Sequence, residues 1–217
     1  MAGNSNLSIA EEIMLLLLHD HDGSFVRLPE WSRRYSLSGA ILMELAEQGR
    51  IDSDLDRLYV VKDESLGKPT VDAVLAEIAS SSEEHNIRYW VERTAERAEE
   101  IREEALQGLI SRGIVEQVDE RILWVFRSRR YPVVDGTVEK ETKLRLLEVL
   151  FSDAIPSPRD VILLCLAHAS GILNEILPRK QLDSVADRID TVRKLDLIGQ
   201  TVATAIWDIE ISIAMSA

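Results

Sequence analysis

Two clusters in this chain place arginines next to aromatic side chains, and both could bind phosphate. Their members are Arg27, Trp31, Arg33, Arg34 and Tyr35 in the first, and Trp124, Arg127, Arg129, Arg130 and Tyr131 in the second. A guanidinium fork matches the geometry of a phosphate group, and an exposed tryptophan can enter a membrane interface. The clusters therefore predict a focused phosphate-headgroup site. The alternative is that these arginines pair with the chain's own acids while the tryptophans fill gaps in the core.

Histidine and cysteine form two further patterns, and we interpret both as structural. Residues 19–22 read HDHD, which offers metal-ligand types, but they stand at the mouth of a turn where aspartate commonly bonds the backbone. Cys165 and His168 are three residues apart and share a helix face. Because they belong to the most apolar segment, we expect a small buried thiol and a satisfied core histidine.

Sequence motifs for catalysis are missing from the chain. It contains no glycine-rich phosphate loop, no nucleophile elbow and no zinc-ligand cluster. Its sequence shows no pattern that would place an acid, a base and a nucleophile together in one catalytic site. We therefore expect a protein that is not an enzyme and that needs no metal and no cofactor.

The composition narrows the choice of partners. The formal net charge of the 217 residues is −13, so phosphate backbones and anionic membranes repel the chain as a whole. Binding to either would need a local basic patch, and nucleic-acid binding is disfavoured. The single cysteine excludes a disulfide framework and fits a reducing compartment. The first residues do not show the basic segment followed by an apolar segment that is typical of a secretory signal. We therefore expect a cytoplasmic protein.

Hydrophobic periodicity and capping residues predict a mainly α-helical protein. Helices are expected over residues 8–20, 36–48, 70–80, 86–112, 137–151, 157–177 and 181–193, with a last one around Trp207. Residues 24–35 read as an irregular segment. Two short strands are expected within residues 50–61, and a hairpin over 115–126 whose turn is formed by 119–121.

The segment 161–177, VILLCLAHASGILNEIL, is the most informative stretch. Ser157 can cap this helix, and Pro158 fits its first position. A helix that is apolar on nearly all sides belongs in the middle of a helical protein. The segment is too short and too polar in its second half to span a bilayer. We interpret it as a buried central helix that has little contact with any ligand.

Four segments together resemble one known family. LSIAEEIMLLLLHDHDG, GAILMELAEQGRI, LISRGIVEQ and LAHASGIL occur here in the order and at the spacing found in the Golgi phosphoprotein 3 family. The resemblance extends from Leu7 to about Trp207. It implies a single mainly α domain over residues 7–217, after a short tail of residues 1–6. That domain would have a core helix bundle, surrounding amphipathic helices and a projecting β-hairpin.

The resemblance also implies a function. Eukaryotic members are non-enzymatic, peripheral Golgi proteins that bind phosphatidylinositol 4-phosphate and retain glycosyltransferases by their cytosolic tails. The family's loop tryptophan corresponds to Trp31, and one of its two basic positions on the long helix corresponds to Arg102. Two other basic positions are occupied here by Ser38 and Glu99. Oligomerisation through the hairpin would involve Ile122, Leu123, Trp124 and Phe126.

The main hypothesis is thus a peripheral membrane or adaptor protein on the cytosolic membrane face. Its weak site for an anionic headgroup would comprise Trp31, Arg33, Arg34 and Arg102, with the two loop arginines compensating for the lost positions. The protein would form homo-oligomers through its hairpin. The alternative is a helical protein–protein interaction module that has lost lipid binding. A third class, nucleic-acid binding by winged-helix-like units, is opposed by the acidic charge.

Overall fold

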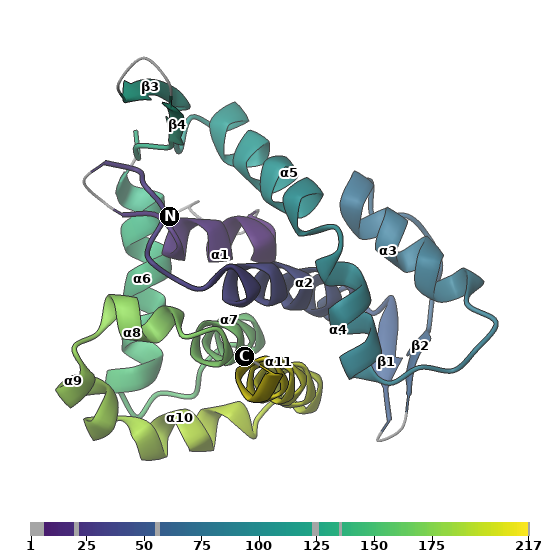
Figure 1. Ribbon diagram of the computed structural model, residues 1–217. Coiled ribbons are helices and arrows are strands. Elements are labelled where there is room, and N and C mark those ends of the chain that lie inside the picture. Colours follow the sequence, from purple (N-terminus) through teal and green to yellow (C-terminus); the bar gives the residue numbers. More distant parts are fainter. Residues whose placement is uncertain (1–6, 20–21, 55–56, 123–125, 135, 217) are drawn as a thin grey trace.

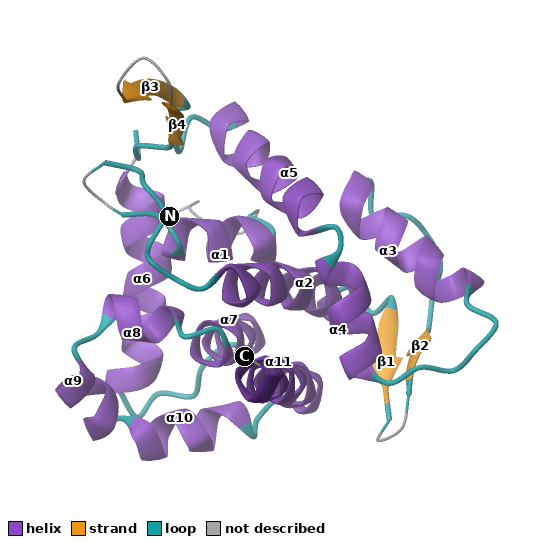
Figure 2. Ribbon diagram, in the orientation of Figure 1, coloured by secondary structure: helices purple, strands orange, loops and turns teal. Residues whose placement is uncertain are grey.

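The computed structural model describes residues 7–19, 22–54, 57–122, 126–134 and 136–216 (Figure 1). Its helices are α1 (Ile9–Leu16), α2 (Glu30–Glu47), α3 (Pro69–Ser80), α4 (Ile87–Ala95), α5 (Ala98–Ser111), α6 (Gly136–Phe151), α7 (Pro158–Ala169), α8 (Ile172–Ile176), α9 (Arg179–Ser184), α10 (Ala186–Arg193) and α11 (Leu197–Ser216). Its strands are β1 (Ile51–Ser53), β2 (Leu58–Val60), β3 (Val118–Ile122) and β4 (Phe126–Arg130). The prediction of a mainly α-helical protein is confirmed (Figure 2).

The helices pack around one hydrophobic core. Helices α7 and α11 lie against each other and against α2, and α2 also contacts α1, α4 and α5. The core includes every residue of α7 from Val161 to Ala167, as expected for a segment that is apolar on all sides. The two strand pairs lie away from this centre, β1–β2 beside α3 and α4 and β3–β4 beyond α5 (Figure 2). The fold is therefore a central group of helices with smaller elements around it.

The predicted caps of α1 and α7 are both present. Ser8 accepts a hydrogen bond from the Glu11 backbone N–H, and the Glu11 carboxylate accepts one from the Ser8 N–H, which completes a capping box at α1. Ser157 accepts from the Asp160 N–H at the start of α7, and Pro158 occupies the first turn. These caps determine where α1 and α7 begin.

The apolar segment is not one helix, so the prediction of a continuous helix over 157–177 is wrong. Helix α7 ends at Ala169, and α8 begins only at Ile172. Gly171 lies between them with φ 73°, the left-handed conformation that other residues adopt at a cost. The chain changes direction here. Ile172, Leu173 and Leu177 remain in the core, and only Asn174 and Glu175 of this second half are exposed.

The predicted helix over 86–112 is also divided. Helix α4 ends at Ala95, and α5 starts at Ala98. The carbonyl of Ala95 accepts hydrogen bonds from the Nε and Nη2 atoms of Arg34, at 3.4 and 3.3 Å. A side chain from another helix thus satisfies a carbonyl at the C-terminal end of α4, and this could not be read from residues 86–112 themselves.

Two other boundaries differ from those predicted. Helix α2 begins at Glu30, directly after Pro29, so Trp31, Arg33 and Arg34 stand on its first turns and not in an irregular segment. The helix expected over 181–193 is divided into α9 and α10 at Val185. The earlier start of α2 matters more for the site, because the geometry of the helix determines the directions of the arginine side chains.

The predicted position of the second strand pair is wrong by several residues. Residues 119–121 were expected to form the turn, but they belong to β3 and pair with residues 127–129 of β4. Ile122 and Phe126 are the last partners of this antiparallel ladder. Leu123 and Trp124 lie outside the described residues. The ladder extends into the arginine-rich segment 127–130, which lies beyond the predicted hairpin.

Helix α11 is long and apolar enough to pass a length-and-composition test for a membrane span. The window Leu197–Met215 has a mean hydropathy of 1.2 and is 33% buried. Its buried residues, including Val202, Ile206 and Ile209, pack against α7, α2 and α4. The core position explains these buried residues, whereas Leu197, Ile211, Ile213 and Met215 of the same helix are exposed.

A buried ion network connects α1 to three other helices. The Glu12 side chain is fully buried, and its two oxygens accept hydrogen bonds from Arg145 of α6 at 2.8 Å and Arg159 of α7 at 2.9 Å. Arg145 also bonds Asp160 at 2.8 Å, and Arg159 bonds Glu47 of α2 at 2.7 Å. Burial raises the pKa of the Glu12 carboxyl, while Arg159 and Arg145 act to lower it. The network fixes α1 against α2, α6 and α7.

Candidate functional site

Three of the four predicted headgroup residues line one small pocket. Arg33 and Arg34 come from the first turns of α2, and Arg102 comes from the middle of α5. The pocket has a volume of about 150 Å³, and its apolar wall is formed by Met14, Leu17, Phe25, Leu37 and Ala98. We call it the arginine pocket. Residues almost 70 positions apart meet here because α2 packs against α5.

Arg102 is partly neutralised within this pocket. Its Nη2 lies 2.6 Å from a carboxylate oxygen of Glu99, one turn earlier on the same helix. Its Nε is buried and has no hydrogen-bond partner. A buried N–H without a partner is costly, and an entering anion could satisfy it. Glu30 adds a second carboxylate to the lining, so three arginines face two acids.

The other two arginines differ in their freedom. Arg34 is held by the carbonyl of Ala95, to which it donates two hydrogen bonds. Arg33 is half-buried, and among the described residues no acid forms an ion pair with its guanidinium group. Arg33 is therefore the cation of this pocket that is most available to a ligand.

Trp31 lies in a different place from the arginines. It follows Glu30 on α2 and lines a second, larger pocket together with Ser32 and His168. The structure therefore brings together Arg33, Arg34 and Arg102 but separates Trp31 from them. The predicted set of four is divided between two pockets on different faces of α2.

Ser38 shows why one basic position of the resembling family has no equivalent here. The Ser38 side chain is fully buried, and its hydroxyl donates a hydrogen bond to the carbonyl of Val91 at 2.7 Å. The position joins α2 to α4 in the core. A long cationic side chain could not be accommodated there without moving the two helices apart.

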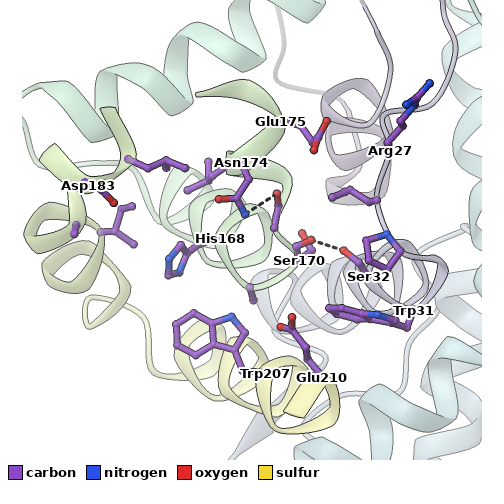
Figure 3. Close-up of a pocket in the computed structure, with 18 of the residues that line it drawn as sticks. Arg27, Trp31, Ser32, His168, Ser170, Asn174, Glu175, Asp183, Trp207 and Glu210 are labelled. Atoms are coloured by element: carbon purple, nitrogen blue, oxygen red, sulfur yellow. Dashed lines mark hydrogen bonds between the residues drawn. The ribbon is translucent and has the colours of Figure 1, made fainter. Parts of the chain in front are cut away.

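The larger pocket has a volume of about 620 Å³ and is shown in Figure 3. It lies between the segment 27–32, the turn from α7 into α8, and helices α9, α10 and α11. The Ser32 hydroxyl donates a hydrogen bond to the carbonyl of Ser170 and joins two of its walls. Sequence reasoning missed this pocket. The signal for it was the sequence SGILNE, where polar residues and a glycine interrupt an apolar helix.

The family profile described as Golgi phosphoprotein 3 (GPP34) matches residues 9–209, which is nearly the whole chain. The chain belongs to the Golgi phosphoprotein 3 family. The arginine pocket lies within the matched region of this Golgi phosphoprotein 3 family member, and so do all the lining residues of the larger pocket except Glu210.

Two curated relatives are fungal proteins with a sorting-related name. The Vacuolar protein sorting-associated protein 74 of Eremothecium gossypii is 26% identical over 206 residues, covering 79% of this chain and 61% of the relative. The protein of the same name from Schizosaccharomyces pombe is 28% identical over 206 residues, covering 79% and 60%. The chain thus spans about three fifths of the length of these relatives.

His168, in the distinctive LAHAS segment of this Golgi phosphoprotein 3 family member, is not a satisfied core histidine. It lines the larger pocket, and its Nδ1 is buried without a hydrogen-bond partner. Its ring meets the edge of Trp207 at a centroid distance of 5.1 Å, and Arg193 lies 4.1 Å over the Trp207 ring. Burial, with a smaller effect from Arg193, lowers the pKa of His168 to about 4. His168 is therefore neutral at physiological pH.

Replacing His168 by glutamine is expected to change how stability depends on pH. The unfolded-state pKa is about 6.5, above the folded value of about 4, so the unfolded chain takes up the proton first. Stability from neutral His168 is complete above pH 6.5 and is lost as pH falls towards 4. The wild-type free energy of unfolding should drop by about 2 kcal/mol more than that of His168→Gln between pH 7.5 and 4.5. Urea denaturation of both proteins at both pH values measures this change. The prediction is contradicted if the difference in the free energy of unfolding between the two proteins is the same at pH 7.5 and 4.5.

Cys165 conforms to its structural interpretation. The thiol is fully buried, and burial raises its pKa to about 12. A thiol that stays protonated at neutral pH is a poor nucleophile. Cys165 and His168 therefore do not form a nucleophile and base pair, because one is a core thiol and the other faces a pocket.

The second arginine cluster and the HDHD turn are linked by an ion pair. Asp22 accepts a hydrogen bond from the Ser24 N–H at 3.0 Å, which supports the turn interpretation at this residue, and Asp20 and His21 lie outside the described residues. The same carboxylate accepts from Arg130 at 2.8 Å, and Tyr131 is buried. In the part of the chain that the structure describes, no group of three or more His, Cys, Asp or Glu side chains could hold a metal ion.

Proposed function

We propose that this chain is a peripheral membrane adaptor that binds a phosphate-bearing lipid headgroup in the arginine pocket. The observation that carries the proposal is the convergence of Arg33, Arg34 and Arg102 on one small pocket, from helices distant in the sequence. A volume of about 150 Å³ suits a single phosphate group better than a whole sugar headgroup. Charge-assisted hydrogen bonds from guanidinium groups are the strongest contacts that such a pocket can make.

Family membership supports the adaptor part of the proposal. Resemblance to Golgi members that bind phosphatidylinositol 4-phosphate makes this lipid the first to test, and a Golgi-facing location on the cytosolic side follows from it. The chain carries a net charge of −13, so attraction to a membrane must come from the local pocket. Each basic residue near an anionic surface contributes about 1 kcal/mol, and binding should be weak and reversible. We propose that homo-oligomers form through β3 and β4.

Flotation of the protein with liposomes tests the headgroup proposal. The wild type should float with vesicles that contain phosphatidylinositol 4-phosphate and remain behind with vesicles that lack it. Arg102→Glu should weaken binding by about thirtyfold, because it changes the pocket by two charges and places a second carboxylate beside Glu99. Arg179→Glu is the matched control. Arg179 is exposed on α9, so this substitution makes the same charge reversal outside the pocket. Equal recovery with and without the lipid would overturn the proposal.

A second candidate is a protein–protein interaction module without lipid binding. The buried hydroxyl of Ser38 and the Glu99–Arg102 ion pair favour it, because both reduce the positive charge that a phosphate would meet. Under this alternative, a defined partner should be recovered from lysate freed of lipid. The Arg102→Glu variant should recover the same partner if the arginine pocket has no role in that contact.

A further inference from the structure

We propose that the 620 Å³ pocket is a second binding site, which takes a small aliphatic polyamine. Its volume lies within the range typical of small-molecule sites, and it is about four times that of the arginine pocket. Of the proposed headgroup residues, only Trp31 lines it. The site is thus separate from the proposed function and can be tested independently of it.

The charge of the pocket calls for a cationic ligand. Four carboxylates line it, from Glu175 of α8, Asp183 of α9, Asp190 of α10 and Glu210 of α11. Arg27 is the only lysine or arginine among its lining residues, which gives these residues a net charge of −3. Arg193, which pairs with Asp190 and lies over the Trp207 ring, offsets part of this charge. His168 adds no positive charge, because its pKa is lowered to about 4.

These carboxylates are available to a ligand. Asp190 forms only a long ion pair, in which its Oδ1 lies 3.8 Å from Nη1 of Arg193. Within the described ranges, none of the other three carboxylates forms an ion pair with a cationic side chain. The overall charge of −13 adds a long-range field that attracts cations to this face.

The placement of the carboxylates favours several separated charges over one metal ion. In Figure 3, Asp183, Glu175 and Glu210 stand on different sides of the pocket and do not converge on one point. A divalent cation needs ligand oxygens at about 2.0–2.6 Å around a single centre. A chain of amines joined by methylene groups can reach carboxylates on opposite sides at once.

The remaining wall suits the methylene groups and the ammonium groups of such a chain. Leu28, Leu173, Leu182 and Ile189 supply aliphatic surface, and Trp31 and Trp207 supply aromatic rings. Indole faces attract cations. Arg193 already occupies one face of Trp207 at 4.1 Å, so Trp31 is the ring that we expect an ammonium group to contact. The unpartnered Nδ1 of His168 is a further polar atom at this wall that the protein itself leaves unsatisfied.

Isothermal titration of the full chain with spermidine tests the site. Saturable one-to-one binding is expected, weakening as salt is added. The double variant Asp183→Asn with Glu210→Gln should weaken binding by about tenfold or more, since two charged contacts are lost. The matched control is Asp187→Asn with Asp208→Asn, which removes two exposed acids of α10 and α11 that do not line the pocket. Its affinity should stay within about twofold of the wild type.

Two further measurements separate this site from the alternatives. Arg102→Glu should bind spermidine as the wild type does, whether or not lipid binding exists. Mg²⁺ at matched ionic strength should not displace the amine. The proposal is overturned if no saturable binding occurs up to millimolar spermidine at low salt. It is equally overturned if both double variants lose the same affinity, or if Mg²⁺ competes at matched ionic strength.

Discussion

Glu12→Gln is expected to lower the free energy of unfolding by about 3 kcal/mol, the largest single effect we anticipate on stability. Glu12 is fully buried and bonds both Arg145 and Arg159, at 2.8 and 2.9 Å. Glutamine is nearly isosteric, but it cannot balance two guanidinium charges and its amide N–H₂ would face an arginine donor. The substitution leaves partly buried positive charge without a partner, and this costs more than an ion pair itself contributes.

Urea denaturation measures the loss in the free energy of unfolding, and the m-value should not change. The melting temperature should fall by about 6–12 °C. The control is Glu92→Gln, because Glu92 pairs with Arg88 at 3.2 Å on an exposed face of α4. An exposed pair of this type contributes less than about 1 kcal/mol. If Glu12→Gln costs no more than Glu92→Gln, the buried network does not hold the four helices together.

Glu99→Arg should strengthen binding to phosphate-bearing vesicles by about thirtyfold, the largest gain expected for the proposed function. The Glu99 carboxylate lies 2.6 Å from Arg102 and competes with phosphate for the same guanidinium group. Its replacement by arginine removes this competitor and adds a cation, a change of two charges beside the pocket. At about 1 kcal/mol for each charge near an anionic surface, the gain is about 2 kcal/mol.

Glu100→Arg is the matched control for this gain. Glu100 is the next residue on α5, pairs with Arg97 at 3.0 Å, and does not line the arginine pocket. Sedimentation with vesicles of the same composition should show a much smaller effect for Glu100→Arg. Equal gains for the two variants would mean that general charge, and not the arginine pocket, determines membrane binding.

Much of the fold could be predicted because its signals are local. The capping box at Ser8 and Glu11 and the Ser157 cap each occupy four consecutive residues, and the structure has both. The apolar segment 161–167 is buried as its composition indicates. The family could also be recognised from four segments in order, and the match over residues 9–209 confirms it.

The helix breaks could not be located from the same signals. The division at Ala95 is accompanied by Arg34 of another helix, which bonds the Ala95 carbonyl. Gly171 was visible in the sequence, but an isolated glycine is tolerated within many helices. Only the packing of α8 against α7 shows that this glycine adopts a positive φ and ends the helix.

The candidate sites show the same division between local and tertiary information. By itself the sequence determined the helical class, the caps, the acidic charge, the family and the candidate arginines. Only the tertiary structure decided that Arg102 joins Arg33 and Arg34 while Trp31 does not, and that His168 and Trp207 meet in a pocket. The physical reason is one of range. A cap or an apolar stripe depends on residues within two turns of a helix, whereas a pocket depends on the angles at which distant helices pack.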